Sequence, residues 1–297
     1  MNSKQTLDII NAGEISKKIK EYARAIAKKD VPLLEIAEKI ENKIYELGAK
    51  PAFPTNLSIN EIAAHYTPLY NDETKACGLL KIDIGVQING WLADTAFSVD
   101  LENSELNKKL IEASKLALTN VEKIINKNST LSEIGKTIEN SINSKGFNPI
   151  VNLSGHSMEK EKLHAGITIP NVNNNSNIKL ETGLFAVEPF ATNGSGKIHD
   201  GKPSGIYELS NLKNSRSPLS REILDYVVEE YSTLPFCSRW LIKKFGTKAL
   251  IGLKQLENEG ILFQFSQLVE VSKGIVSQAE NTFLIEKDKV TITTKED

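Results

Sequence analysis

The sequence has little cysteine and little net charge. Cys77 and Cys237 are the only two cysteines among 297 residues, and they form no C-x-x-C pair, so cysteine-rich metal sites are excluded. We expect two free thiols, as is usual in a reducing compartment. The formal net charge of -2 supplies no overall positive field that would attract nucleic acid or an anionic membrane.

Long hydrophobic runs are also missing. No stretch approaches the roughly 20 apolar residues that a membrane span needs. The first residues carry lysines and acids without the apolar core of a secretory signal. We therefore expect a soluble, cytoplasmic protein whose 40% of hydrophobic residues suffice for one large core, or for a core with a small satellite.

Helical periodicity is present in four segments. Apolar side chains recur near every 3.6 residues over residues 5 to 29 and about 32 to 47, and again over about 103 to 127 and 131 to 145. These four segments are predicted to be helices.

The clearest local signal is a β-hairpin over residues 81 to 98. Apolar residues alternate with polar residues or glycine, which is typical of a strand with one buried face. The dipeptide Asn89-Gly90 is favoured in a tight type I′ turn. That turn makes Asp83 and Asp94 diagonal neighbours on one face of the hairpin, roughly 7 to 8 Å apart.

Two bare carboxylates placed in this way repel each other. A cation between them, a proton on one of them, or exposure of both to open water would relieve the repulsion. The hairpin alone does not choose among these three states.

Other residues along the chain favour a metal site. His156 and His164 fall in one loop between strand-like segments and are flanked by Gly155 and Gly166, which makes that loop a candidate site. Glu188 lies inside a predicted apolar strand over residues 183 to 190, and Glu280 has a similar setting, where an unpaired carboxylate would be costly to bury. Four carboxylates and one imidazole suit a pair of divalent first-row ions.

The pattern changes between about 200 and 267. Three short helices followed by a strand are predicted there, which indicates a small helical module with a winged-helix-like order inserted into the main domain. From Asp200 to Glu270 the chain carries nine Lys/Arg and nine Asp/Glu. A neutral module lacks the basic stripe that phosphate binding requires.

The order of the metal-binding candidates resembles that of the five ligands of the pita-bread metallopeptidases: Asp83, Asp94, His156, Glu188 and Glu280. The local motifs narrow the resemblance to the type 2 methionine aminopeptidases in their short archaeal form. These motifs are A-F-P-T-N (52 to 56), A-A-H-Y-T-P (63 to 68), K-I-D-I-G (81 to 85), L-A-D-T-A-F (92 to 97), S-G-H-S (154 to 157), A-V-E-P-F (186 to 190) and Q-A-E-N-T (278 to 282).

The resemblance implies an α+β pita-bread (creatinase/aminopeptidase) fold. The catalytic domain would comprise residues 1 to 199 and 268 to 297, and the inserted helical, winged-helix-like subdomain residues 200 to 267. The implied activity is removal of the N-terminal methionine from nascent polypeptides when the second residue is small. The implied nucleophile is a hydroxide that bridges two divalent metal ions.

The resemblance also implies a role for each site residue. Asp83 would chelate one ion and Asp94 and Glu280 would bridge both, while His156 and Glu188 would hold the other, with cobalt, manganese, iron and zinc as candidate metals. Glu188 would also relay a proton. His164 would steady the scissile carbonyl, and His65 would contact the substrate amide near the second residue. The positions aligned with the methionine pocket are Phe53, His199 and Phe265.

Two other interpretations stay open. A prolidase or Xaa-Pro aminopeptidase would use the same five ligand types, but it usually carries an extra N-terminal domain, and here the hairpin already begins near residue 81. A non-catalytic relative that binds nucleic acid or the ribosome would typically lose metal ligands, and all five positions are filled. We therefore expect a monomeric enzyme that acts on nascent N-termini, with at most transient ribosome contact and no specific nucleic-acid or membrane partner.

Overall fold

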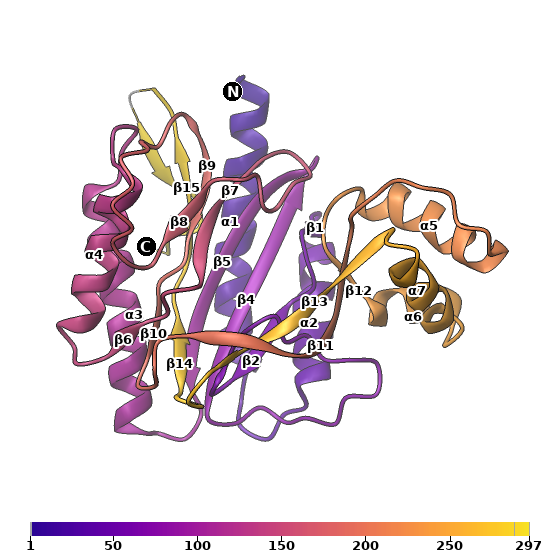
Figure 1. Ribbon diagram of the computed structural model, residues 1–297, viewed down its shortest axis with the longest axis horizontal. Coiled ribbons are helices and arrows are strands. Elements are labelled where there is room, and N and C mark those ends of the chain that lie inside the picture. Colours follow the sequence, from indigo (N-terminus) through magenta and orange to yellow (C-terminus); the bar gives the residue numbers. More distant parts are fainter. Residues whose placement is uncertain (1, 288, 297) are drawn as a thin grey trace.

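The computed structural model describes residues 2–287 and 289–296 (Figure 1). Its helices are α1 (Ser3–Ile26), α2 (Leu33–Glu46), α3 (Glu105–Ile124), α4 (Leu131–Asn143), α5 (Pro218–Tyr231), α6 (Ser238–Phe245) and α7 (Ala249–Asn258). Its strands are β1 (Lys50–Pro51), β2 (Asn56–Ile59), β3 (Ile62–Ala64), β4 (Leu79–Ile88), β5 (Trp91–Asp100), β6 (Asn148–Pro149), β7 (Ser154–Met158), β8 (Thr168–Pro170), β9 (Gly183–Val187), β10 (Phe190–Thr192), β11 (Ile198–Leu209), β12 (Phe236–Cys237), β13 (Leu262–Glu270), β14 (Val276–Gln278), β15 (Asn281–Ile285) and β16 (Val290–Ile292).

The helix predictions for the first half of the chain are confirmed. All four predicted helices form, and each end lies within three residues of its predicted place. Among the described residues, none of the helices combines the length and apolar character of a transmembrane segment.

Two pairs of helices cover two sets of antiparallel strands. The pair α1 and α2 packs against β4 and β5, and their apolar side chains form one core. The pair α3 and α4 packs beside the sheet of order β16-β15-β9-β7-β8, and a second core forms there. Figure 1 shows the strands of both sets running between the two helix pairs. The strand faces that turn away from the helices therefore meet in the middle of the molecule.

The predicted β4–β5 hairpin is confirmed in register. The two strands pair from Leu79 with Asp100 to Ile88 with Trp91, and Gly85 lies opposite Asp94. The turn residues Asn89 and Gly90 have φ of 52° and 82°, as a type I′ turn requires. The expectation of one buried face was wrong, because residues on both faces are buried: one face packs under α1 and α2, and the other faces the middle of the molecule.

The three helices and the strand predicted between residues 200 and 267 also form. Helices α5, α6 and α7 share their own core, which includes Ile223, Leu241 and Leu253. The long strands β11 and β13 pair with each other and connect these helices to the rest of the chain (Figure 1). Both strands extend past the predicted limits of the inserted subdomain, since β11 begins at Ile198 and β13 ends at Glu270.

A buried ion pair joins α6 to α2. Arg239 donates from both terminal nitrogens to the two carboxylate oxygens of Glu41, at 2.7 and 2.8 Å. Trp240 Nε1 also donates to Glu41, at 2.8 Å, and Arg239 Nε donates to the carbonyl of Pro68 at 3.1 Å. Both charged side chains are almost fully buried. The forked geometry satisfies the guanidinium and fixes the helical module on α2.

We predict that Glu41→Gln lowers the free energy of unfolding by about 3–5 kcal/mol, because it leaves the Arg239 guanidinium buried without a counter-charge. Urea denaturation measures this loss. The matched control is Glu35→Gln on the same helix, where the carboxylate makes an exposed pair with Lys39 at 2.6 Å. The control is expected to leave stability unchanged, since exposed pairs contribute little. Equal effects of the two substitutions would contradict the prediction.

Candidate functional site

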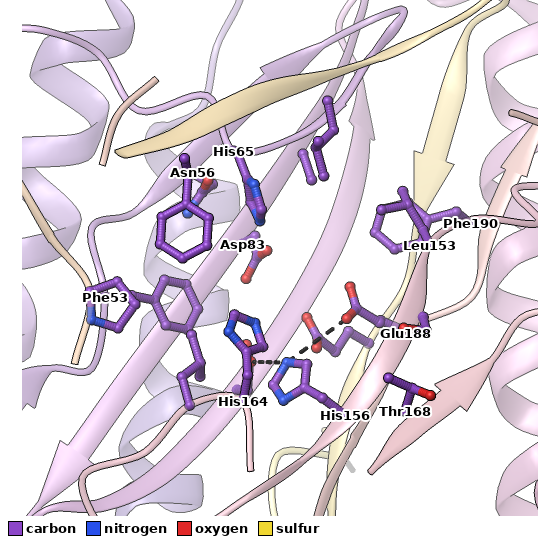
Figure 2. Close-up of a pocket in the computed structure, with 18 of the residues that line it drawn as sticks. Phe53, Asn56, His65, Asp83, Leu153, His156, His164, Thr168, Glu188 and Phe190 are labelled. Atoms are coloured by element: carbon purple, nitrogen blue, oxygen red, sulfur yellow. Dashed lines mark ion pairs between the residues drawn. The ribbon is translucent and has the colours of Figure 1, made fainter. Parts of the chain in front are cut away.

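A cavity of about 350 Å³ lies where β4, β5, β7, β11 and β13 come together. Figure 2 shows its wall: Asp83, His156 and Glu188 lie near its centre, with Phe53, His65 and His164 on one side and Leu153, Thr168 and Phe190 on the other. The remaining lining residues used below are Asp94, Leu163, Ile206, Pro235, Phe265, Leu268 and Glu280. All five residues predicted to bind metal therefore line one cavity.

Two threonines hold β5 against β15, and so place Asp94 beside Glu280. The Asp94 amide donates to Thr282 Oγ1 at 2.8 Å, and the same hydroxyl donates back to the Asp94 carbonyl at 2.7 Å. Thr95 Oγ1 donates to the carbonyl of Glu280 at 2.9 Å. These bonds are buried, so the backbone under both carboxylates is fixed without using the carboxylates themselves.

His156 and Glu188 come from neighbouring strands. His156 lies within β7, opposite Ala186 of β9, and not in the loop predicted for it. Glu188 follows the last residue of β9, and the predicted single strand over 183 to 190 is divided there, because Pro189 has no N–H to donate.

Glu280 likewise lies between two strands, β14 and β15, where a strand setting had been predicted. The register that pairs Val187 with Asn281 ends the β9–β15 ladder beside Glu188 and Glu280. Both glutamates thus occupy the point where the ladder opens, which frees their side chains to face the cavity.

The ligand atoms lie close together. His156 Nε2 is 3.5 Å from Asp94 Oδ2 and 3.9 Å from Glu188 Oε1 (dashed lines in Figure 2). Ligand atoms of Asp94, His156 and Glu280 all lie within 4.8 Å of one another. Asp83 is the diagonal neighbour of Asp94 on the same hairpin face, as predicted from the turn.

Burial raises the pKa of every carboxylate in this group. Desolvation raises the pKa of Asp94 to about 7. Desolvation, and then repulsion by neighbouring carboxylates, raises the pKa values of Asp83, Glu188 and Glu280 well above their ordinary range. Asp83 and Glu188 are half-buried, and both line the cavity. The group therefore requires either protons or added positive charge.

The three cavity histidines are neutral near pH 7. Desolvation lowers the pKa of His156 to about 4, and desolvation followed by repulsion from His156 lowers that of His164 to about 3. Desolvation, and then His164, lowers the pKa of His65 to about 4. A neutral imidazole has a free lone pair for a metal, or an N–H to donate to a substrate.

The residues present fit a divalent metal centre. Asp83 Oδ1, Asp94 Oδ1 and Glu280 Oε2 are buried atoms without a hydrogen-bond partner among the described residues. An unsatisfied buried carboxylate oxygen is costly unless a cation compensates it. Oxygen donors with one neutral imidazole are a typical ligand set for divalent first-row ions.

Aromatic rings continue the cavity wall away from the acids. The His164 ring meets the His156 ring edge-on, with centroids 4.6 Å apart, and His65 meets Phe265 in the same way at 5.2 Å. The His65 backbone is left-handed, with φ of 60°, which is uncommon for residues other than glycine. His65, His164, Phe53 and Phe265 thus form one side of the cavity next to the carboxylates.

The structure does not bring His199 to this cavity. His199 lies on β11 opposite Val269, its side chain is exposed, and its Nδ1 faces the carbonyl of Asp200 at 3.0 Å. Ile206, further along the same strand, lines the cavity in its place. Two register shifts in β11 between Asp200 and Tyr207 separate the two positions.

Several apolar lining residues were missed from the sequence, among them Leu163, Ile206 and Pro235 in the aromatic recess. Leu163 is the residue before His164 and could have been found from that position. Ile206 and Pro235 reach the cavity only through the pairing of β11 with β12 and β13, which no local pattern reveals.

Comparison with known proteins identifies the family of this chain. The model of metallopeptidase family M24 matches residues 8–230. The chain is 47% identical to a methionine aminopeptidase of Pyrococcus abyssi over 292 residues, covering 97% of this chain and 98% of that protein. It is 45% identical to a methionine aminopeptidase of Methanocaldococcus jannaschii, covering 97% of each.

Solved structures show the same fold at low identity. A thermophilic Arx1 superposes with a TM-score of 0.87 at 18% identity, covering 99% of this chain and 91% of that one. The methionine aminopeptidase from Thermotoga maritima superposes with a TM-score of 0.72 at 19% identity, covering 100% of this chain and 98% of that one. The prolidase from Pyrococcus furiosus superposes with a TM-score of 0.62 at 16% identity. The match covers 100% of this chain and 65% of the prolidase.

The predicted α+β pita-bread fold is confirmed by these structural neighbours, and the resemblance to methionine aminopeptidases by the long, nearly complete sequence matches. The chain belongs to metallopeptidase family M24 and, within that family, to the methionine aminopeptidases.

Proposed function

We propose that this protein removes the N-terminal methionine from nascent polypeptides whose second residue is small, using two divalent metal ions. One observation carries the proposal: four carboxylates and a neutral imidazole line one cavity directly beside an aromatic recess, in a chain similar over almost its whole length to methionine aminopeptidases. The metal would hold the reacting end of the peptide, and the recess its first side chain.

In this proposal Asp83 would hold one ion, His156 and Glu188 would hold the other, and Asp94 and Glu280 would serve both. The unsatisfied buried oxygens and the raised carboxylate pKa values support this, since both are relieved by added positive charge. The bound ions would supply Lewis acidity and make a water molecule nucleophilic near neutral pH. Cobalt, manganese, iron and zinc all suit these donors, because ligand type alone does not select among them.

Glu188 and the two neutral histidines do the remaining work. The pKa of Glu188 is raised by burial and by Asp83, so its carboxyl is suited to take a proton and pass it to the departing amine. His164 donates an N–H to the carbonyl oxygen of the scissile bond as negative charge develops there. His65 donates to the amide next to the second residue. Each role requires a ring nitrogen that carries a proton, and a neutral imidazole has one.

The recess suits an unbranched apolar side chain. Its wall combines two phenyl rings with aliphatic side chains: Phe53, Leu163, Ile206, Pro235 and Phe265. Methionine fills irregular apolar space well, and its sulfur packs favourably against aromatic rings. On the other side of the acids the cavity is lined by Leu153, Phe190 and Leu268, and we propose that these side chains limit the second residue to a small one.

The domain division follows from the same proposal. Residues 1 to 199 and 268 to 297 form the catalytic domain, and residues 200 to 267 form the inserted subdomain, which is supported by the separate core of α5, α6 and α7. We propose a monomer that acts in the cytoplasm, where nascent N-termini appear.

We predict that chelator-treated protein releases methionine from Met-Ala-Ser only after cobalt or manganese is added. Met-Lys-Ser should stay intact because its second side chain is long. Gly-Pro serves as the control for a prolidase, and its cleavage in place of Met-Ala-Ser would contradict the proposed substrate.

Asp94→Asn is expected to abolish methionine release, because the amide cannot bridge two cations as a carboxylate does. Turnover and bound metal per chain should both be measured. Glu112→Gln, which alters an exposed ion pair with Lys145, should change neither. Full activity of Asp94→Asn at saturating metal would exclude a bridging role.

His164→Ala is expected to lower kcat by about 10²- to 10³-fold, the usual effect of removing one donor to a developing oxyanion. Bound metal should stay constant, as measured by metal analysis. The control is His199→Ala, since His199 is exposed outside the cavity. Loss of metal from His164→Ala would instead identify His164 as a ligand.

A further inference from the structure

Glu161 occupies a strained turn midway between His156 and His164. The turn is closed by two backbone hydrogen bonds between Glu159 and Lys162, at 3.0 and 3.1 Å. Glu161 itself is left-handed, with φ of 57°. A glutamate in this conformation persists only where its surroundings hold it there.

Three contacts hold Glu161. Its amide donates to the carbonyl of Gly90 at 2.7 Å, its Oε2 accepts from Ser232 Oγ at 3.1 Å, and its carbonyl accepts from Thr233 Oγ1. Gly90 is packed so closely that an added Cβ would lie 2.7 Å from Glu161 Cγ. We call the set Gly90, Glu161, Ser232 and Thr233 the Glu161 junction.

The Glu161 junction joins three segments that each reach the cavity. The first is the turn of the β4–β5 hairpin, whose strands carry Asp83 and Asp94. The second runs from Glu161 to Leu163 and His164. The third follows α5 and runs from Ser232 through Leu234 to Pro235. Leu163 and Leu234 pack in one cluster with Phe53, so the junction also closes the base of the aromatic recess.

The position of the His164 ring depends on its backbone. Among residues 2–287 and 289–296, no hydrogen bond orients this ring, which meets the rings of His156 and Phe265. Beyond His164, the amide of Ala165 donates to the carbonyl of Ser157 at 2.8 Å. Before His164, the Glu161 junction is the fixed point. The segment is therefore held at two ends, and one end depends on hydroxyl groups supplied by the helical module.

We propose that Glu161, Ser232 and Thr233 are positioning residues that hold His164 in place, so that the inserted module acts on the reaction through them. This inference rests on the proposed function of His164. In this proposal the inserted module affects the reaction through the position of His164, and none of the module's charged groups contacts the substrate.

The test is a double-mutant cycle on the whole protein. Ser232→Ala/Thr233→Val removes both hydroxyl donors with little change in volume. We expect it to lower kcat for Met-Ala-Ser by about tenfold, since a small misplacement of a catalytic group is enough for that. Bound metal and the melting temperature should change little. In the His164→Ala background the same pair of substitutions should change kcat by less than about twofold, because the two act through one group.

Two further variants separate positioning from general loss of structure. Thr233→Ser keeps the hydroxyl donor. With Ser232 unchanged, this variant should keep the wild-type kcat. Ser217→Ala removes the side-chain cap of α5, which bonds the Ser220 amide, and so weakens the same module without touching the junction. It should leave kcat unchanged.

Equal losses of kcat in the wild-type and His164→Ala backgrounds would overturn the inference, as would a loss with Ser217→Ala or an unchanged kcat in the double variant. Wild-type protein that releases no methionine with any metal would overturn the proposed function itself. An active wild type with an unaffected double variant would overturn the positioning role alone.

Discussion

Mutual repulsion among Asp83, Asp94, Glu188 and Glu280 is the constraint on which the rest of the structure depends. Four carboxylates facing one cavity oppose folding unless positive charge or protons accompany them. The neighbouring threonines hold the backbone of the site and do not compensate its charge. The hydroxyl groups of Thr95 and Thr282 donate hydrogen bonds to backbone carbonyls and not to the carboxylate oxygens. The carboxylate oxygens of the site therefore stay available for cations. Their unmade hydrogen bonds lower the stability of the metal-free protein, and metal binding to the folded state would offset this loss.

The same logic explains why the neighbouring imidazoles are uncharged. A protonated histidine beside the acids would neutralise them internally and compete with metal. Desolvation within the cavity lowers the pKa values of His65 and His156 to about 4, far enough to prevent this near pH 7. Desolvation in the cavity thus raises the pKa values of the carboxyl groups and lowers those of the imidazoles. Neither group then compensates the other, and both effects favour the binding of metal cations.

Local patterns in the sequence predicted the parts of the site that depend on local geometry. The Asn89-Gly90 turn determines the hairpin register, so the diagonal placement of Asp83 and Asp94 followed from adjacent residues alone. The order of the other ligands came from resemblance, and their strand environments were partly wrong, because Pro189 divides a strand that apolar composition alone would continue. His199 was misplaced because its position depends on the irregular pairing of β11 with β13, which is a property of two segments some 60 residues apart. Glu161 gave no signal at all, since nothing in the sequence marks a glutamate that tertiary contacts force into a left-handed turn.

The alternation of the hairpin restricts how its length can vary. In β4, Ile82, Ile84 and Val86 enter the core under α1 and α2, while Asp83 faces the cavity. Insertion or deletion of one residue within the strand would exchange these two faces, sending the carboxylate into hydrocarbon and isoleucine toward the metals. A change of two residues would preserve the faces. The core residues and the metal-binding carboxylate therefore depend on the same alternation along β4, and neither set can change its position without the other.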